Sequence, residues 1–361
     1  MLVQPRKLNV RKLIWVLAVL LAFAAVTWRR DPPGPKHPAW TGETMGTLYS
    51  IKLADSPLGR RALQSLQKEV DRCLVEVNRQ MSHYQPDSEL SRFNRADATQ
   101  PVAVSAGFAR VVRFALELHE RSGGVFDPTL GPLIDLWGFG APGRVAEPPS
   151  EEQIAEVLHG VGARHLSITS DGRLRKAIPG LHLNLSAVAK GYGVDEAARV
   201  IRARGITNVF VEIGGEGVAF GHNAEGVPWR IGVDTPRPDA LPGEQLETVL
   251  HLSGLAVATS GDYRNFFTDE KGERFSHILD PRTGRPIQHH LASVSVVARD
   301  CMTADGLATA LFVMGAEEGM KWLDTWPGIE ALFIIREPDG RFACRPSPGF
   351  VRLTGARLPA P

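Results

Sequence analysis

The stretch of residues 254–315 constrains this chain most, because three segments of different chemistry lie close together in it. It opens with a glycine turn that carries an Asp and an Arg, in the sequence ATSGDYRN (258–265). A His and a basic loop rich in Pro and Gly follow in SHILDPRTGRP (276–286), and a helical pattern containing an Asp closes the stretch in ADGLATALFVMG (304–315). A hydrophobic core requires none of these polar groups. A site for phosphate and a metal ion would use all of them.

Asp305 and Thr309 lie four residues apart in the last segment, whose other positions follow an apolar helical pattern. Side chains at this spacing share one face of a helix, one turn apart. Magnesium takes oxygen ligands and completes its shell with waters or substrate phosphates, so one Asp, one Thr and a backbone carbonyl would suit it. The alternative is that Asp305 caps or begins the helix while Thr309 packs in the core.

The middle segment combines His277 with Asp280, Arg282, Thr283 and Arg285 around a Pro-x-x-Gly turn. Arginine is the preferred planar partner of phosphate oxygens, and histidine carries protons near neutral pH. The alternative is that DPRTG is a simple surface turn.

Other segments give weaker indications of a ligand site. Residues 214–217 (GGEG) follow a predicted strand but lack the G-x-G-x-x-G spacing, so they indicate a close backbone approach to a ligand rather than a Rossmann site. Lys190 follows a strand-to-helix turn, where backbone amides attract anions, although it could equally be a solvated residue at a helix start. Tyr84 and Phe126 could stack on an aromatic ligand or belong to the core.

The N-terminus predicts a targeting segment, because four basic residues precede an uninterrupted apolar run at 13–26. We expect residues 1–30 to form a signal-anchor or a signal peptide, and favour an uncleaved anchor, followed by a Pro-rich spacer at 31–40. A buried core helix is disfavoured by the basic flank. The three cysteines are an odd number without metal-type spacing, so no disulfide is expected.

The body of the chain alternates between helical and strand patterns, with 43% hydrophobic residues and a net charge of only +1, which does not favour nucleic acid as a partner. No internal repeat and no linker after residue 40 is evident, so one mixed α+β domain is expected at 41–357. The apolar residues 125–140 are broken by Pro and Gly and are expected to line a site. Helices are predicted at 59–81, 105–122, 150–160 and 186–205, and strands at 47–53, 165–169, 182–185, 208–213, 229–233, 248–252, 256–260, 293–297 and 331–335.

Taken together and in this order, the sequence blocks resemble the ApbE family of flavin transferases over nearly all of residues 41–320. The matching blocks are ETMGTLYSI, MSHYQPDSELSRFN, VFDPTLGPLIDLWGFG, LNLSAVAKGYGVD, VEIGGE, ATSGDYRNFF, SHILDPRTGRPI and ADGLATALFVMG.

The resemblance implies an α+β fold with a core related to the T-fold. It also implies a Mg²⁺-dependent enzyme that cleaves the pyrophosphate of FAD, releases AMP and attaches FMN through a phosphoester to a Thr hydroxyl of a partner protein. The acceptor would be a subunit of a membrane redox complex. The enzyme itself would sit at the inner membrane with its catalytic domain in the periplasm.

Carried over by motif position, the resemblance assigns each candidate residue a role. His277 would help to deprotonate the acceptor hydroxyl, and Asp305 could share that task while it holds the metal. Many relatives have Asp where this chain has Asn184. The metal ligands would be the carbonyl of Ala187, Asp305 and Thr309, and the flavin or nucleotide contacts would be Met45, Tyr84, Val125, Phe126, Asp127, Asn184, Lys190 and Leu279.

Two other functions remain open at this point. The protein could hydrolyse FAD to FMN and AMP with water in place of the acceptor, or it could bind flavin without catalysis. The presence of His277, Asp305 and Thr309 argues against pure binding, since storage of a flavin requires neither a metal nor a base.

Overall fold

A computed structural model of the protein describes Trp15 and residues 31–359, except 97–99, 141, 144, 146 and 270. Apart from Trp15, the predicted signal or anchor segment at 1–30 lies outside the described residues. Within the described part of the chain, no helix is long and apolar enough to span a membrane.

The centre of the fold is an eight-stranded sheet whose neighbouring strands all pair antiparallel. Every residue of the central strand β14 is buried, because this strand is covered on both faces. The strands follow one another across the sheet in the order β1 (Ala39–Thr44), β2 (Thr47–Leu53), β5 (Val209–Ile213), β6 (Glu216–Phe220), β9 (Leu255–Gly261), β14 (Leu291–Ala298), β15 (Glu330–Arg336) and β16 (Phe342–Pro346).

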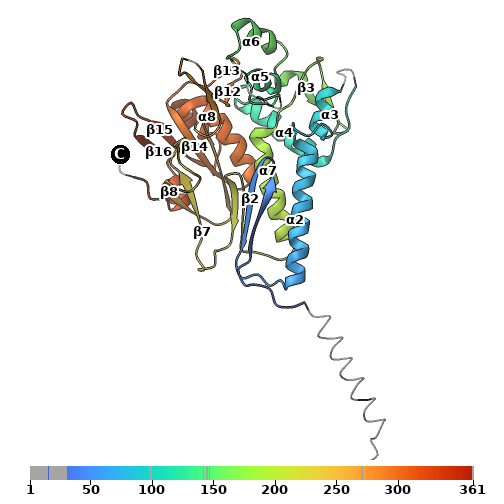
Figure 1. Cartoon of the computed structure of the whole chain (residues 1–361), viewed down its shortest axis with the longest axis vertical. Helices are drawn as coiled ribbons and strands as arrows, with labels where there is room; N and C mark the ends of the chain where they lie inside the picture. Colours follow the sequence, from blue (N-terminus) through green and yellow to red (C-terminus); the bar gives the residue numbers. More distant parts are fainter. Residues whose placement is uncertain are drawn as a thin grey trace, which may run out of the picture.

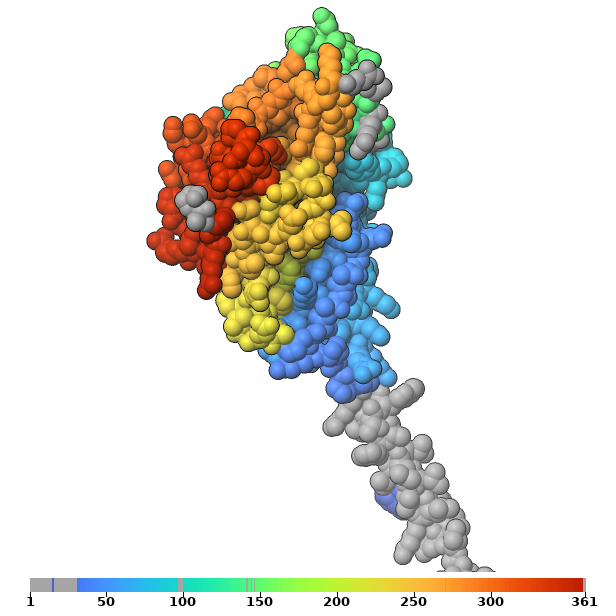
Figure 2. All heavy atoms as spheres, turned by 60° about the vertical axis from the view of Figure 1, so that its left-hand side comes forward, coloured from blue at the N-terminus to red at the C-terminus, as the bar shows by residue number. Residues whose placement is uncertain are grey.

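Helices cover one face of the sheet, and a hairpin covers the other. On the helical face, α2 (Arg60–Met81) and α7 (Ser186–Arg202) pack on β2, β5 and β6, and α8 (Cys301–Leu323) packs beside them (Figure 1). On the opposite face lie the hairpin of β7 (Trp229–Asp234) with β8 (Leu246–Leu252) and the short helix α9 (Phe350–Thr354). In Figure 2 this hairpin, in yellow, lies on the surface between the blue N-terminal strands and the red C-terminal segment.

Shorter elements gather at one end of the body. Figure 1 shows α5 (Gly131–Leu136), α6 (Glu151–Leu158), β12 (Leu279–Asp280) and β13 (Arg285–Pro286) at this end, away from the start of α2. The remaining elements are α3 (Glu89–Arg95), α4 (Ala106–Arg121), the 3₁₀ turn η1 (Ala163–His165) and the hairpins β3 (Leu166–Ile168) with β4 (Leu174–Lys176) and β10 (Phe266–Thr268) with β11 (Arg274–Ser276).

The mixed α+β architecture and the predicted helices are confirmed. One predicted strand is wrong, because the segment 181–185 has no regular secondary structure. The side chain of Asn94 explains the difference: its Oδ1 accepts from the Leu183 amide at 2.8 Å, and its Nδ2 donates to the Leu183 carbonyl at 2.9 Å. A side chain therefore takes the backbone groups that a neighbouring strand would otherwise pair.

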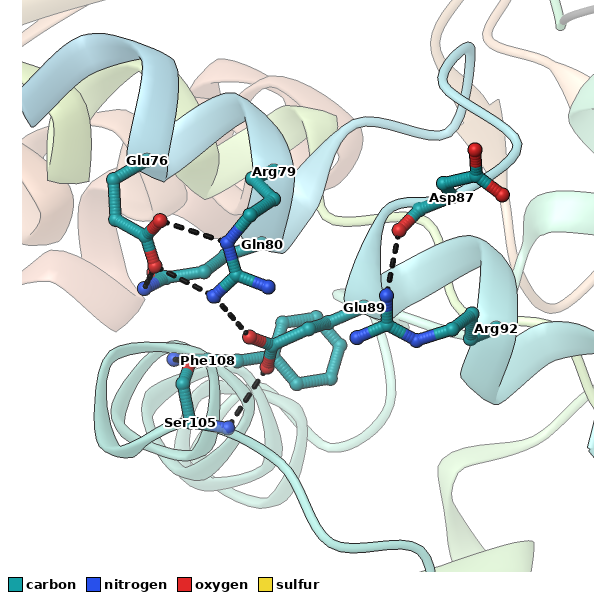
Figure 3. A network of polar contacts seen from close by, with 8 residues as sticks. All are labelled: Glu76, Arg79, Gln80, Asp87, Glu89, Arg92, Ser105 and Phe108. Atoms are coloured by element: carbon teal, nitrogen blue, oxygen red, sulfur yellow. Dashed lines mark hydrogen bonds and ion pairs between the residues drawn. The ribbon is translucent and has the colours of Figure 1, made fainter. Parts of the chain in front are cut away.

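A buried carboxylate fixes the junction of α2, α3 and α4 (Figure 3). Glu89 Oε1 accepts from Arg79 at 2.8 Å, and Glu89 Oε2 accepts from the backbone amide of Ser105 at 2.8 Å. Arg79 also pairs with Glu76 on its own helix, and the Ser105 hydroxyl caps α4. This network holds both ends of the loop that carries Tyr84.

We expect Glu89→Gln to lower the free energy of unfolding by about 2–3 kcal/mol, since hydrogen bonds to charged groups contribute about 1.5–3 kcal/mol each. Chemical denaturation of the purified protein measures the loss. The matched control is Glu76→Gln, which removes an exposed partner of the same arginine and should cost about 1 kcal/mol or less. Equal losses in the two variants would contradict the role given to Glu89.

Candidate active site

Helices α7 and α8 touch at Gly191. A Cβ atom on Gly191 would lie 2.4 Å from the carbonyl oxygen of Cys301 and 2.8 Å from the Cα of Met302, so no side chain fits there. One turn later on α7, the carboxylate of Asp195 accepts from the Cys301 amide at 2.9 Å and from the Met302 amide at 3.0 Å. Asp195 thus caps the start of α8, where the free amides attract a carboxylate. These contacts fix the position of Asp305, which follows on the same helix.

Asp305 is a buried carboxylate, only 5% exposed, and its Oδ2 accepts from the Gly191 amide at 2.9 Å. Gly191 is four residues after Ala187, so a regular helix directs this same amide at the Ala187 carbonyl. The carboxylate and the carbonyl therefore approach one N–H group. Burial raises the pKa of Asp305 to about 8, and the negative charge of Glu216 adds to the effect.

Thr309 lies one turn after Asp305 on α8, and its hydroxyl is 3.3 Å from that of Ser260 on β9. The described residues contain no group of three His, Cys, Asp or Glu side chains that could hold a metal. A cation here would instead take one carboxylate, one hydroxyl and one carbonyl oxygen from the protein. Such hard oxygen donors fit Mg²⁺ and leave positions for substrate phosphates.

A partly buried ion pair lies near Asp305. Lys190 Nζ lies 2.5 Å from Oε1 of Glu216, the first residue of β6, and Glu216 is only 3% exposed. Burial raises the pKa of the Glu216 carboxyl. Burial opposes the charged form of Lys190, but the charges of Glu216 and Asp305 raise the pKa of its amine above the usual range. Lys190 therefore stays an ammonium facing both carboxylates.

Glu216 is absent from the residues predicted from the sequence. The sequence indicates it only through its position directly after Gly214 and Gly215. Both glycines have a positive φ and form the tight turn between β5 and β6. A charged residue that re-enters a central strand after such a turn is buried, and a buried charge requires a partner.

His277 lies just before β12 and is half-buried. Its Nδ1 is 3.0 Å from the carbonyl oxygen of Asn265, so Nδ1 carries the proton and donates it. Burial lowers the pKa of His277 to about 4, and the positive charge of Lys190 contributes to the lowering. The imidazole is thus neutral at pH 7, and the lone pair on Nε2 can accept a proton.

Met45 and Tyr84 are two of the predicted contact residues that keep side-chain surface available, as do Asn184 and Lys190. Met45 has a positive φ of 50° in the turn between β1 and β2. Its methyl group packs against Gly193 of α7, so closely that a Cβ added to Gly193 would lie only 2.6 Å from it. Tyr84 is 65% exposed, and its ring centroid lies 3.9 Å from that of His83. Both side chains are therefore placed for contact with a bound ligand.

The side chains of Val125, Phe126 and Leu279 are buried in hydrophobic clusters. Phe126 accordingly belongs to the core, the second of the two alternatives for this ring. Any contact of these three residues with a ligand comes from the backbone.

Asp127 uses its carboxylate for local structure. Its Oδ1 accepts from the amide of Thr129 at 2.8 Å and from the hydroxyl of the same residue at 2.6 Å, while Oδ2 accepts from the Ala163 amide at 3.1 Å. These bonds tie residues 125–140 to η1. The carboxylate has little capacity left for a ligand.

Asn184 lies at a cavity of about 160 Å³ between α3 and α5. Its Oδ1 accepts from the Ser186 amide at 2.9 Å, at the start of α7. An amide oxygen accepts this bond as a carboxylate would, so the local turn survives the replacement of Asp by Asn.

Burial lowers the pKa of His83 and of His182. The cavity is lined by His83, Ser91, Asn94, Arg95, Gly131, Asp135, His182, Leu183 and Asn184.

The arginines of the basic loop are already paired. Arg282 forms a bidentate contact with Asp280, with a closest N–O distance of 2.8 Å, and Arg285 pairs with Glu151 of α6. The loop therefore resembles the surface turn that was its alternative interpretation. Lys190 is the cation that faces Asp305.

Comparison with known proteins agrees with this geometry. The model of the ApbE family matches residues 45–333. An FAD:protein FMN transferase of Vibrio cholerae is 45% identical over 300 residues, which cover 83% of this chain and 88% of the relative. One from Haemophilus influenzae is 38% identical over 344 residues, which cover 94% of this chain and 97% of the relative.

Solved structures show the same fold. The flavin transferase ApbE of Vibrio cholerae superimposes with a TM-score of 0.79 at 42% identity, covering 88% of this chain and 98% of the other. The apo flavinyl transferase ApbE of Pseudomonas stutzeri gives a TM-score of 0.79 at 40% identity, covering 90% and 98%.

We expect Gly191→Ala to force α7 and α8 apart and to lower the free energy of unfolding by about 1–3 kcal/mol, the usual cost of overpacking. Chemical denaturation measures this cost. Gly160→Ala is the control, because a Cβ there would meet its nearest atom at an ordinary 3.6 Å. If both variants unfold like the wild type, the close contact of α7 with α8 does not exist in solution.

Proposed function

This chain belongs to the ApbE family, and on that premise we propose that it is an FAD:protein FMN transferase acting on a Thr hydroxyl of a partner protein. The observation that carries the proposal is the cluster of two buried carboxylates and one ammonium: Asp305 accepts from the amide of Gly191, and the preceding residue, Lys190, pairs with Glu216. A flavin-storage protein requires no such arrangement.

The reaction exchanges the phosphoanhydride bond of FAD for a phosphoester bond to the acceptor. The acceptor Thr oxygen attacks the phosphorus of the FMN half of FAD, and the bond from this phosphorus to the bridging oxygen breaks. AMP leaves with the bridging oxygen, and FMN becomes linked to the Thr as a phosphodiester. Transfer of this kind depends on positioning and on neutralising charge more than on covalent chemistry by the protein.

His277 is suited to take the proton of the acceptor hydroxyl. A Thr hydroxyl is a weak nucleophile and requires a base within hydrogen-bond reach. Because Nδ1 donates to the Asn265 carbonyl, the basic nitrogen is Nε2, and the partial exposure of the ring leaves room for an incoming hydroxyl. Asp305 already accepts the Gly191 amide, so His277 is the better placed of the two proposed bases.

Asp305, Thr309 and the Ala187 carbonyl would hold Mg²⁺. When bound, the ion supplies positive charge that stabilises the diphosphate of FAD and the leaving AMP. Lys190 adds an ammonium to the same side of the site, held in place by Glu216. Met45, Tyr84 and Asn184, with the backbone at Val125, Phe126, Asp127 and Leu279, would bind the flavin and the nucleotide.

We also infer a location and a partner. The basic residues and apolar run of segment 1–30 would anchor the protein at the inner membrane, with a catalytic domain at 41–357 and a T-fold-related core in the periplasm. Asp31 accepts from the amides of Arg61 and Ala62, so the spacer is fastened to the start of α2. The acceptor would be a Thr-containing subunit of a membrane redox complex.

One incubation distinguishes the possible activities. The protein is mixed with FAD, Mg²⁺ and an acceptor domain from a membrane redox complex, and the products are resolved by gel fluorescence and chromatography. A fluorescent acceptor band with release of AMP supports transfer. FMN without a labelled band would indicate hydrolysis, and the absence of both products would indicate binding alone.

We expect Asp305→Ala to abolish acceptor labelling while the protein stays folded, because it removes the only carboxylate of the proposed cation site. Gel fluorescence measures the labelling, and circular dichroism confirms the fold. Asp280→Ala is the control, since among the described residues this carboxylate bonds locally, to the amide and the guanidinium of Arg282. Labelling by Asp305→Ala at the wild-type rate would exclude the metal assignment.

We expect His277 to titrate near pH 4 rather than near about 6.5, the value of a free histidine. Because the folded pKa is lowered, the neutral base persists as the pH falls from 8 to about 5, and it is lost only on further acidification. An NMR titration of the imidazole without metal measures this pKa, with the signal assigned through His277→Gln. A midpoint near 6.5 would show that the ring is solvated, and the base would then be half protonated at that pH.

A further inference from the structure

Glu216 carries an oxygen that the fold leaves without a donor. Its Oε1 is 2.5 Å from Lys190 Nζ, whereas Oε2 is buried and has no hydrogen-bond partner among the residues that the structure describes. Buried polar atoms in native proteins almost always have a partner, so an orphaned oxygen indicates a group that is not part of the chain. If Glu216 served only as the partner of Lys190, the fold would have no need to leave Oε2 without a hydrogen bond.

The charges around this oxygen indicate which kind of group is missing. Two buried carboxylates, those of Glu216 and Asp305, lie beside a single ammonium group, that of Lys190. An anionic ligand would meet these carboxylates unfavourably if it approached them directly. A divalent cation would favour the ionised form of both carboxylates, and the site could then receive the anionic diphosphate of FAD.

We propose that Glu216 is a positioning residue for the divalent cation. Its Oε1 holds Lys190, and its Oε2 is the acceptor kept free for the hydration shell of the ion beside Asp305. Mg²⁺ retains several of its waters in proteins, and outer carboxylates that accept hydrogen bonds from them orient the ion and strengthen its binding. The proposal rests on the Mg²⁺-dependent function given above and extends it to a residue outside the predicted ligands.

The fold explains why this role falls to Glu216. It is the first residue of β6 after the turn of Gly214 and Gly215, so it re-enters the sheet beneath the start of α7. Lys190 is the fifth residue of α7, and the next residue, Gly191, donates its amide to Asp305. Two adjacent residues of one helix thus contact the two carboxylates.

The test is the affinity of the full-length protein for Mn²⁺, measured by electron paramagnetic resonance without FAD, and for Mg²⁺ by calorimetry. We expect Glu216→Gln to weaken binding by about 10–100-fold, the usual effect of losing an outer partner of a metal site. Glu216→Asp keeps the charge and should lose less. Lys190→Met removes a competing positive charge and should bind the ion at least as tightly as the wild type.

The sign of the Lys190→Met effect separates cation positioning from mere packing of the ion pair. If Lys190→Met weakens binding as much as Glu216→Gln, both variants only disturb a packed pair, and the proposal is overturned. It is also overturned if folded Glu216→Gln binds Mn²⁺ within twofold of the wild type. Circular dichroism checks the fold. If Glu216→Gln does not fold, the proposal is tested by comparing the Mn²⁺ affinities of Glu216→Asp and Lys190→Met.

Failure of the proposed function would look different. In that case the wild type would not label an acceptor domain in the fluorescence assay, whatever its affinity for Mn²⁺. If Asp305→Ala loses Mn²⁺ binding and the wild type labels the acceptor normally, both the proposed function and the proposed role of Glu216 stand.

Discussion

The close contact between α7 and α8 at Gly191 is the constraint on which the site depends. The contact requires a residue without a side chain, because the Cys301 carbonyl occupies the place of a Cβ. It also requires Asp195, which caps α8 from α7. Only with the helices this close does the Gly191 amide reach Asp305, and only then do the carbonyl of Ala187 and the carboxylate approach one another. The proposed metal site would therefore be made by helix packing, and not by a loop.

Packing at this density places ionisable groups where water screens them poorly. Glu216 and Asp305 are buried carboxylates that share a single ammonium, that of the partly buried Lys190. Buried ion pairs rarely contribute net stability, since the desolvation of each ion offsets the attraction. Their retention here is understandable if a divalent cation and an anionic substrate complete the balance. These groups thus contribute little to stability while the site is empty, but they would be needed for function once the cation and the substrate are bound.

The sequence predicted the architecture better than it predicted the contacts of individual side chains. Periodic apolar residues located α2, α4 and α7, and the spacing of Asp305 and Thr309 placed them on one helix face. The pairing of Lys190 with Glu216 could not be predicted, because it joins a helix to a strand 26 residues away. Likewise, no local pattern shows that the Asp127 carboxylate accepts hydrogen bonds from Thr129 and Ala163, or that the Asn94 side chain accepts from the backbone amide of Leu183. Such contacts arise from tertiary packing, which sequence periodicity does not encode.

One physical cause, the removal of water, shifts the pKa values of the two candidate groups in opposite directions. Burial disfavours the charged form of any group, so it lowers the pKa of His277 and raises the pKa of Asp305. For His277 the result is a neutral base at the pH where a free histidine would be partly protonated. For Asp305 the result is a carboxylate that ionises easily only when a positive charge arrives. The same environment would therefore keep His277, the proposed base, neutral, and would make the ionisation of Asp305 depend on the proposed cation.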